Sequence, residues 1–125
     1  MSSRSFRDNN PGNIRHHSDG PGHPMYPVSL IFQGADDGDN YAKFPSISQG
    51  CAALAMLLAT KYKDMTVGDA MAKYAPSDDG NDPQKYAKVI CSWAGITTVR
   101  IIGTLAPNQF FDLCKAITRF EGWIP

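Results

Sequence analysis

Apolar residues are unevenly distributed along the chain and divide it into two stretches. The first 45 residues are rich in Gly, Pro, Asn and Asp and hold few apolar residues at a regular spacing, which predicts loops. Within this stretch we expect a small β-hairpin, with strands at residues 29–33 and 40–44 around a turn at residues 34–39. From Ser46 onward the apolar residues recur at helical spacing, so the rest of the chain is predicted to be mainly helical.

Four helices are predicted in the second stretch, over about Ser46–Tyr62, Thr66–Tyr74, Asp82–Gly95 and Pro107–Glu121. The first three begin at a residue whose side chain can cap a helix, and the third also has Pro83 at its first position. The run Cys51–Ala59 is apolar on every side, which predicts a central helix surrounded by others. The β-branched segment 97–105 is ambiguous. Because no repeat or linker interrupts the pattern, we predict a single domain, residues 1–125, of the mainly helical α+β class.

The overall composition narrows the possible functions. Of the 125 residues, 42% are hydrophobic, which is enough for one core. Lys and Arg number 12, as do Asp and Glu, so no basic excess favours a nucleic-acid partner. The longest apolar run is too short to span a bilayer, and no signal peptide opens the chain. We therefore expect no transmembrane segment, and synthesis in the cytoplasm without an export signal.

Neither the cysteines nor the histidines predict a metal site. Cys51, Cys91 and Cys114 lie in apolar helical contexts without C-x-x-C spacing, and their odd number leaves at least one unpaired. Free thiols are the expected state, as in a reducing cytosol. The three histidines lie within residues 16–23, a Gly/Pro-rich loop without the helical spacing that presents two imidazoles to one ion. We therefore expect no metal and no cofactor.

Glu121 is the leading candidate for catalysis. The last predicted helix carries one apolar stripe, made by Phe110, Leu113, Cys114 and Ile117. Glu121 falls near the centre of that stripe, where burial would disfavour its charged form and raise its pKa. A carboxyl that keeps its proton near neutral pH can act as a general acid. The alternative is a frayed last turn before Gly122 in which Glu121 faces water.

The opening of the chain carries a motif. Residues 7–15 read Arg-Asp-Asn-Asn-Pro-Gly-Asn-Ile-Arg, which resembles the N-N-P-G-N-I-R opening of a lysozyme-like family found in phage virion proteins and secreted bacterial cell-wall effectors. Asp8 departs from the resemblance, because the effector-like family usually has Asn there. Further matches follow in order over nearly the whole chain: Phe44, Ser46, Gly50, Ala53, Leu57, Tyr62, residues 74–76, Asn81, Asp82 and Tyr86.

The resemblance implies a fold and a place for the catalytic acid. The chain is also similar to flagellar-type glucosaminidases, whose catalytic Glu lies on a helix before the Asn-Asn pair, but here only eight residues precede Asn9. Residues 116–122 instead resemble the segment that carries the catalytic Glu in lysozyme-like transglycosylases, with Glu121 in its place. The resemblance therefore implies a circularly permuted lysozyme-like fold, with the first helix moved to the end and the two termini close together.

The predicted substrate-binding residues are Asn9, Asn10, Asn13, Tyr41, Tyr74 and Trp123. The three asparagine amides can either fix a rigid loop beside the active helix or contact sugar directly, and Asn10 and Asn13 are favoured as groups that line the cleft. Gly12 within the motif permits a positive φ or a close approach. The three aromatic side chains are candidates for stacking on pyranose rings.

A standard retaining or inverting glycosidase needs a second carboxylate. Asp36, Asp37 and Asp39 lie in the predicted hairpin turn, where lysozyme-like folds can place such a group, although a solvated turn is the simpler interpretation. Their spacing also resembles a calcium loop but lacks the distal Glu. Without a firm second carboxylate, a mechanism with Glu121 alone is favoured: it protonates the glycosidic oxygen, and a substrate hydroxyl, an acetamido group or water completes the reaction.

The resemblance implies an enzyme that cleaves the glycan strands of peptidoglycan, as a muramidase, a glucosaminidase or a lytic transglycosylase. Because no signal peptide is present, we expect delivery to the periplasmic cell wall by a phage particle, a holin-dependent route or an injecting secretion machine. An injected toxin would also require an immunity protein that covers the cleft. The alternative is a non-catalytic wall-binding or virion structural module with the same fold.

Overall fold

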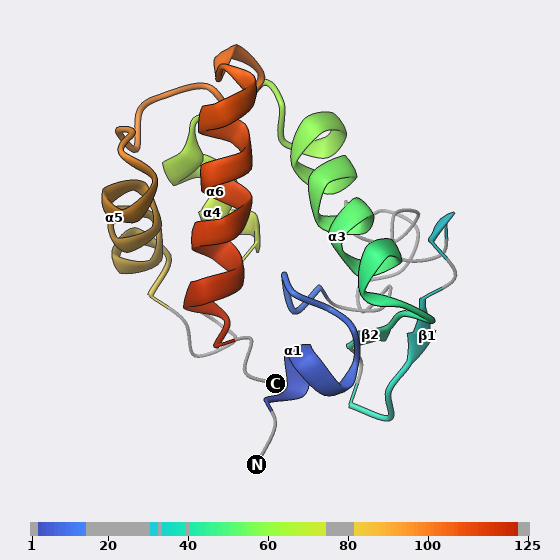
Figure 1. The fold of residues 1–125 in the computed structure, drawn as a ribbon. Coiled ribbons are helices and arrows are strands. Elements are labelled where there is room, and N and C mark those ends of the chain that lie inside the picture. Colours follow the sequence, from blue (N-terminus) through green and yellow to red (C-terminus); the bar gives the residue numbers. More distant parts are fainter. Residues whose placement is uncertain (1–2, 15–30, 33, 40, 75–81, 123–125) are drawn as a thin grey trace. The chain divides into compact units, whose positions relative to one another are not determined.

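The computed structural model describes residues 3–14, 31–32, 34–39, 41–74 and 82–122, and the structural statements below concern these residues. The elements, in chain order, are α1 (Arg4–Arg7), β1 (Ala35–Asp36), β2 (Ala42–Lys43), α3 (Ile47–Met56), the π-helical turn η1 (Leu57–Lys61), α4 (Val67–Tyr74), α5 (Pro83–Ala94), the 3₁₀ turn η3 (Ile102–Thr104) and α6 (Pro107–Phe120) (Figure 1). Helices predominate over the short strand pair, which confirms the predicted mainly helical α+β class.

The chain divides into two compact units. Residues 1–61 together with residues 121–125 form the first, and residues 62–120 form the second. The first unit therefore contains both the Asn-rich motif and Glu121, which stand near opposite ends of the sequence. The organisation of residues 1–125 as a single domain stays a prediction.

A short helix, α1, lies where the sequence predicts only loop. It comes before the asparagines of the opening motif, and residues 9–14 are called the Asn-rich motif. The Ser3 side chain caps α1 by accepting a hydrogen bond from the Phe6 N–H (3.3 Å), and Asp8 ends it. A helix of four residues shows no apolar stripe, so the hydrophobic pattern gives no sign of it. The Asn10 N–H donates to the Ser5 carbonyl (2.7 Å), so the motif continues directly from the helix.

The strands form one antiparallel pair, in which the opposed residues are Ala35 with Lys43 and Asp36 with Ala42. β2 lies inside the predicted strand at residues 40–44. The other predicted strand, at residues 29–33, is wrong at its described residues 31 and 32, and β1 lies instead inside the predicted turn. The Asp37 carboxylate explains the shift, because it accepts the N–H groups of Asp39 (2.7 Å) and Tyr41 (3.3 Å) and so tightens the turn.

The most apolar run lies on α3 and η1, which together match the helix predicted over residues 46–62. Ser46 caps this helix, because its Oγ accepts a hydrogen bond from the Gln49 N–H (3.3 Å). The prediction that the helix is surrounded on every side is wrong, since Cys51 and Ala59 are exposed. Its buried side chains are Ala53, Leu54, Leu57 and Leu58. No helix in the described part of the chain is long and apolar enough to cross a membrane.

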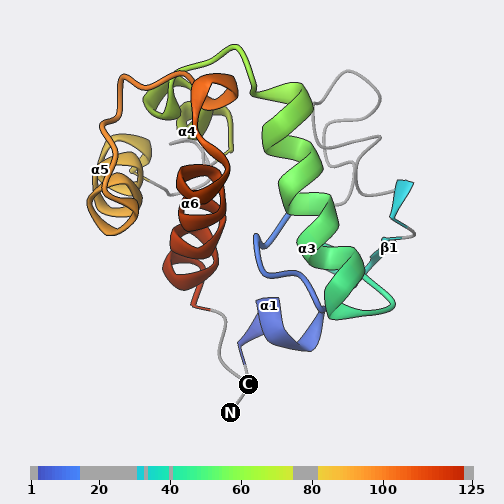
Figure 2. The same ribbon diagram turned by 45° about the horizontal axis from the view of Figure 1, so that its top comes forward.

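In the second unit, α5 packs against both α4 and α6 (Figure 2). The predicted caps are in place: Thr66 Oγ1 accepts the Asp69 N–H (3.1 Å), and Asp82 Oδ1 accepts the Lys85 N–H (3.1 Å). Gly95 ends α5 in the left-handed conformation, at φ 72°. The helices contribute the buried side chains Val67, Ala70, Met71, Tyr74, Tyr86, Ala87, Ile90, Cys91, Leu113, Ala116 and Ile117. The three helices predicted from caps and periodicity in this unit are confirmed.

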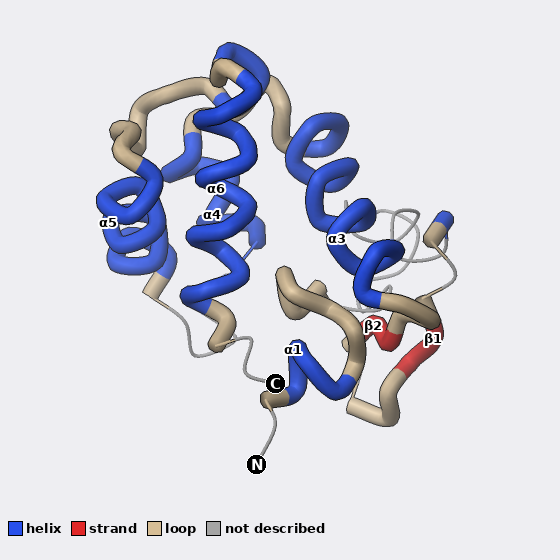
Figure 3. The backbone as a smooth tube through the Cα atoms, viewed as in Figure 1, coloured by secondary structure: helices blue, strands red, loops and turns tan. Residues whose placement is uncertain are grey.

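The ambiguous segment 97–105 is mostly loop (Figure 3) and runs beside the start of α4. The carbonyl oxygens of Arg100 and Thr98 accept hydrogen bonds from the first two N–H groups of α4 (3.0 Å each). The first N–H groups of a helix have no acceptor within that helix. The β-branched segment therefore supplies acceptors to a helix start rather than forming a strand of a sheet.

Candidate functional site

The Asn-rich motif is a tight loop whose turns fall on asparagines. Asn9 has φ 52° and Asn13 has φ 50°, in the left-handed region that is uncommon for residues other than glycine. Asn tolerates this conformation because its short polar side chain can bond locally. Gly12, where the sequence predicts such freedom, has no positive φ. Two asparagines thus set the path of the loop.

Asn10 forms the buried centre of this loop. Its Oδ1 accepts the Ile14 N–H (2.9 Å), and its Nδ2 donates to the carbonyl oxygens of Ile14 (2.9 Å) and Ala42 (2.9 Å). The residue is completely buried. Of the two interpretations that the sequence leaves open for Asn10, the geometry favours the structural one, because its amide is already engaged with Ile14 in the motif and with Ala42 on β2.

Asn9 fixes the loop to the start of α3. Its Nδ2 donates to the Phe44 carbonyl (3.0 Å), and its own carbonyl oxygen lies against Gly50. A Cβ at Gly50 would collide with that oxygen. The sequence marks Gly50 only as a match to the family, and the close approach of two backbones explains why a glycine stands there.

Asn13 reaches the predicted catalytic acid. Its Nδ2 donates to Glu121 Oε1 at 3.3 Å, across 108 residues of sequence. Its Oδ1 is buried and accepts no hydrogen bond from the described residues. The structure thus brings together one predicted substrate-binding residue and the predicted acid.

Glu121 lies just beyond the end of α6, in the turn that Gly122 closes at φ 70°. The side chain is half-buried. The sequence predicts either a buried Glu on the apolar stripe or a Glu that faces water in a frayed last turn. The observed position lies between the two, because Glu121 follows the helix but is partly buried and accepts a hydrogen bond from Asn13. The stripe residues Leu113 and Ile117, earlier on α6, are fully buried.

A carboxyl pair that the sequence does not predict lies beside the motif. Asp8 is buried, with Oδ2 meeting no donor among the described residues, and the Asp37 side chain is 8% exposed. Burial, a hydrogen bond to Asp37 and repulsion from its charge raise the pKa of Asp8 to about 7. Burial also acts on Asp37, but its hydrogen bonds from Asp8, Asp39 and Tyr41 outweigh burial and hold its pKa below the usual value.

Asp37 is therefore no solvated turn residue, which corrects the simpler interpretation of the acidic turn. Its Oδ2 lies 3.8 Å from Arg4 Nε, while the exposed Asp39 pairs with Arg4 Nη2 at 3.4 Å. The sequence signal for this cluster is weak, because acidic residues around a Gly-containing turn are usually solvated.

Two of the three predicted aromatic platforms, Tyr41 and Tyr74, are described by the structure, one in each unit. Tyr41 is half-exposed, and the Arg4 guanidinium lies 4.4 Å from its ring centroid. Tyr74 is 8% exposed, with its ring edge-on to Tyr62 and Tyr86, so it belongs to the core of the second unit and offers no open ring face to a sugar. Trp123 lies outside the described residues.

The sequence predicts no metal site from the cysteines or the histidines, and of these residues the structure describes only the cysteines. Cys51, Cys91 and Cys114 are free thiols, and burial raises the pKa of Cys91 to about 11. The described part of the chain holds no group of three His, Cys, Asp or Glu side chains that could bind a metal ion. The predicted loop histidines, within residues 16–23, lie outside it.

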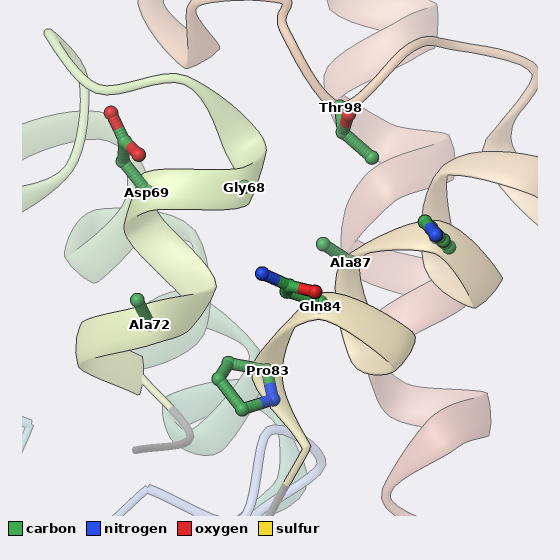
Figure 4. Close-up of a pocket in the computed structure, with 8 residues that line it drawn as sticks. Gly68, Asp69, Ala72, Pro83, Gln84, Ala87 and Thr98 are labelled. Carbon is green, nitrogen blue, oxygen red and sulfur yellow. The ribbon is translucent and has the colours of Figure 1, made fainter. Parts of the chain in front are cut away.

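A separate hollow of about 430 Å³ lies in the second unit between α4 and α5 (Figure 4). Its lining residues are Gly68, Asp69, Ala72, Pro83, Gln84, Ala87, Lys88 and Thr98. Figure 4 shows the Gln84 amide lying between the two helices. None of the residues predicted for catalysis or sugar binding lines this hollow, so it adds nothing to the Asn13–Glu121 site.

In comparisons with known proteins, no protein-family model matches the chain and no curated protein matches it. The lysozyme-like resemblance therefore rests on the motif residues themselves.

Proposed function

We propose that the protein is a peptidoglycan-degrading glycosidase in which Glu121 is the general acid and Asn13 orients it. One observation carries the proposal: the Asn13 amide donates to the Glu121 carboxyl group at 3.3 Å. The two residues come from the two segments that the resemblance links to such enzymes, the N-terminal Asn motif and the C-terminal Glu segment. A contact between these segments is what a lysozyme-like site built in permuted order requires.

The circularly permuted lysozyme-like fold belongs to the same proposal. Its support is that Glu121 falls in one compact unit with residues 1–61, which hold the Asn motif and the strand pair. In the unpermuted order, the helix that carries the acid comes directly before the loop that holds the Asn motif. In a permuted chain that helix comes last, so its acid must still lie against the same loop in the folded protein.

The chemistry needs a carboxyl that gives a proton to the glycosidic oxygen as the bond to C1 breaks. A side-chain amide beside this carboxyl restricts its rotamers and so holds it in one orientation. As the bond to the leaving group breaks, an oxygen forms a new bond to C1 and gives its proton to the Glu121 carboxylate that the first step leaves. Attack by water gives hydrolysis, and attack by the substrate's own hydroxyl gives an anhydro sugar. Asp37 is a poor nucleophile for this step, because two backbone N–H groups and Arg4 already occupy its oxygens.

The proposed substrate is the MurNAc/GlcNAc backbone of peptidoglycan, reached after delivery by a phage or as an injected antibacterial effector. In the second case an immunity protein would cover the Asn13–Glu121 site. A neighbouring-gene product that binds the protein and stops digestion would support the effector route.

Digestion of purified sacculi by the wild type and by Glu121→Gln tests the proposal, with products identified by mass spectrometry. We expect soluble muropeptides from the wild type and a loss of at least about 100-fold in Glu121→Gln, because general acid catalysis contributes about 10²–10⁴-fold. Asp112→Asn is the matched control, since Asp112 is another carboxylate, lies on α6 and pairs with Lys115 at 3.8 Å. If the wild type is folded and binds sacculi but releases no muropeptides, the glycosidase proposal fails and the non-catalytic wall-binding module is favoured.

A further inference from the structure

The hollow between α4 and α5 exists because small residues face it from both helices. Gly68 and Ala72 are four residues apart on α4, and each lines the hollow. Pro83 and Ala87 have the same spacing on α5 and line it from the other side. None of these side chains is long enough to fill the space. The resulting volume of about 430 Å³ lies within the range of about 300–1,000 Å³ typical of small-ligand sites.

The walls of the hollow are fixed by the packing of the second unit. α5 packs against α4, and the Thr98 carbonyl accepts the Gly68 N–H (3.0 Å), which joins the segment after α5 to the start of α4. Ala87 is buried, as are Tyr86 and Ile90 on the same helix. The hollow is therefore already formed without a ligand, and binding does not have to open it.

Polar side chains with unused hydrogen-bonding groups complete the lining. Asp69 lies at the α4 edge of the hollow, Gln84 and Lys88 belong to α5, and Thr98 comes from the segment that follows (Figure 4). Among the described residues, the Asp69 carboxylate and the Lys88 ammonium form no ion pair, and the Gln84 amide forms no hydrogen bond. Two opposite charges and an amide thus surround one space and stay available to a ligand.

The lining disfavours several classes of ligand. The eight lining residues include no aromatic ring, so a pyranose has no platform to stack on. One ammonium group with a carboxylate on the opposite helix does not suit a nucleotide or another polyanion, which needs a cluster of positive charges. One carboxylate and one amide are also too few ligands for a metal ion.

We propose that this hollow binds a short peptide with small side chains, a free amine and a carboxylate. The amine pairs with Asp69 and the carboxylate with Lys88, which makes two charge-assisted hydrogen bonds. Asp69 is exposed, so its carboxylate can change rotamer to meet the ligand. The peptide groups match Gln84, whose side-chain amide both donates and accepts. Methyl side chains fit beside Ala72 and Ala87.

The peptidoglycan stem peptide has this chemistry, since it carries alanine methyl groups, the free amine of a diamino acid and carboxylates. Naming it as the ligand rests on the proposed function, whereas the peptide site itself does not. The protein would then recognise the glycan strand at Asn13–Glu121 in the first unit and the peptide at the hollow in the second. Such a site would distinguish peptidoglycan from glycans that carry no peptide.

An NMR titration of the ¹⁵N-labelled full chain tests the site. The probe is the stem tetrapeptide with its N-terminus acetylated, so that the only free amine is that of the diamino acid. We expect saturable shifts of the Gln84 side-chain amide and of the Gly68 backbone amide. Lys88→Gln should weaken binding about tenfold, as expected for the loss of one charge-assisted hydrogen bond. Lys85→Gln is the matched control, because Lys85 is also exposed on α5 but does not line the hollow.

Acetylating the remaining amine of the probe separates a direct contact from a distortion of the hollow. The doubly acetylated peptide should bind the wild type about tenfold more weakly, whereas Asp69→Asn should bind the two peptides equally. An Asp69→Asn protein that kept the tenfold difference would contradict the Asp69 contact. The absence of saturable shifts in the wild type, or an equal effect of Lys85→Gln and Lys88→Gln, would overturn the site.

Trialanine, a peptide with an amine, a carboxylate and methyl side chains but no diamino acid, distinguishes the sources of the ligand. Tighter binding of the stem peptide would assign the ligand to the cell wall, and equal affinities would remove that assignment while keeping the peptide site. Digestion of sacculi without peptide binding would contradict the site alone. Peptide binding without digestion would count against the glycosidase and leave the site standing.

Discussion

At the scale of single residues, the motif's three asparagines have three separate tasks. Asn10 bonds the loop to itself and to β2, Asn9 bonds it to the Phe44 carbonyl, and Asn13 bonds to Glu121. The sequence can predict that such amides fix a loop or bind a ligand, since an amide both donates and accepts. It cannot predict which asparagine does which, because each one also bonds to a residue more than 30 positions away.

Asn10→Asp should be strongly destabilising. The change keeps the shape but removes the donor to the carbonyl oxygens of Ile14 and Ala42 and places a charge against them. The Ile14 carbonyl keeps its hydrogen bond from the Ala42 N–H, but the Ala42 carbonyl loses its donor and the new charge faces both oxygens, so we expect a loss of about 2 kcal/mol or more. Urea unfolding at neutral pH would measure this loss, with Asn108→Asp as the control at an exposed position in the first turn of α6. A loss no larger than that of Asn108→Asp would show that the Asn10 contacts carry little free energy.

At the scale of elements, the contact of α3 with the motif depends on a missing side chain. Gly50→Ala should destabilise the protein by about 2 kcal/mol or more, because the added methyl meets the Asn9 carbonyl oxygen, which is backbone and held in a tight loop. Gly68→Ala on α4 is the matched control, since its Cβ would lie at an ordinary 3.5 Å from the Thr98 carbonyl oxygen. The control should stabilise by up to about 1 kcal/mol through helix propensity. Thermal unfolding of both variants measures these changes in stability. An equal change in the two variants would contradict the close approach of the Asn9 carbonyl to Gly50.

Most elements could be predicted from the sequence because their signals are local. Ser46, Thr66 and Asp82 cap helices with side chains three residues from the N–H they accept, and Gly95 ends one in the left-handed conformation. The strand positions could not be predicted in the same way. They depend on the Asp37 carboxylate, which tightens the turn, and the repeat of apolar residues does not encode such a bond.

At the scale of the whole molecule, the candidate site depends on one long-range contact. The periodicity of α6 and the resemblance both select Glu121, but neither gives a partner for it. Asn13 lies 108 residues away in sequence, and only the folded chain brings the two together. The Asp8–Asp37 pair was missed for the same reason, since each residue by itself looks like an ordinary acidic group at the end of a helix or in a turn.

A double-mutant cycle between Asn13→Ala and Glu121→Ala measures this long-range contact without any assumption about function. Because the Asn13 amide donates to the carboxylate at 3.3 Å, we expect a coupling free energy of about 1 kcal/mol in urea unfolding at neutral pH. The control cycle pairs Asn13→Ala with Asp112→Ala, whose carboxylate is engaged with Lys115, and should be additive within about 0.5 kcal/mol. Additivity in both cycles would mean that Asn13 and Glu121 do not interact in solution, and the general acid would then lose its orienting group.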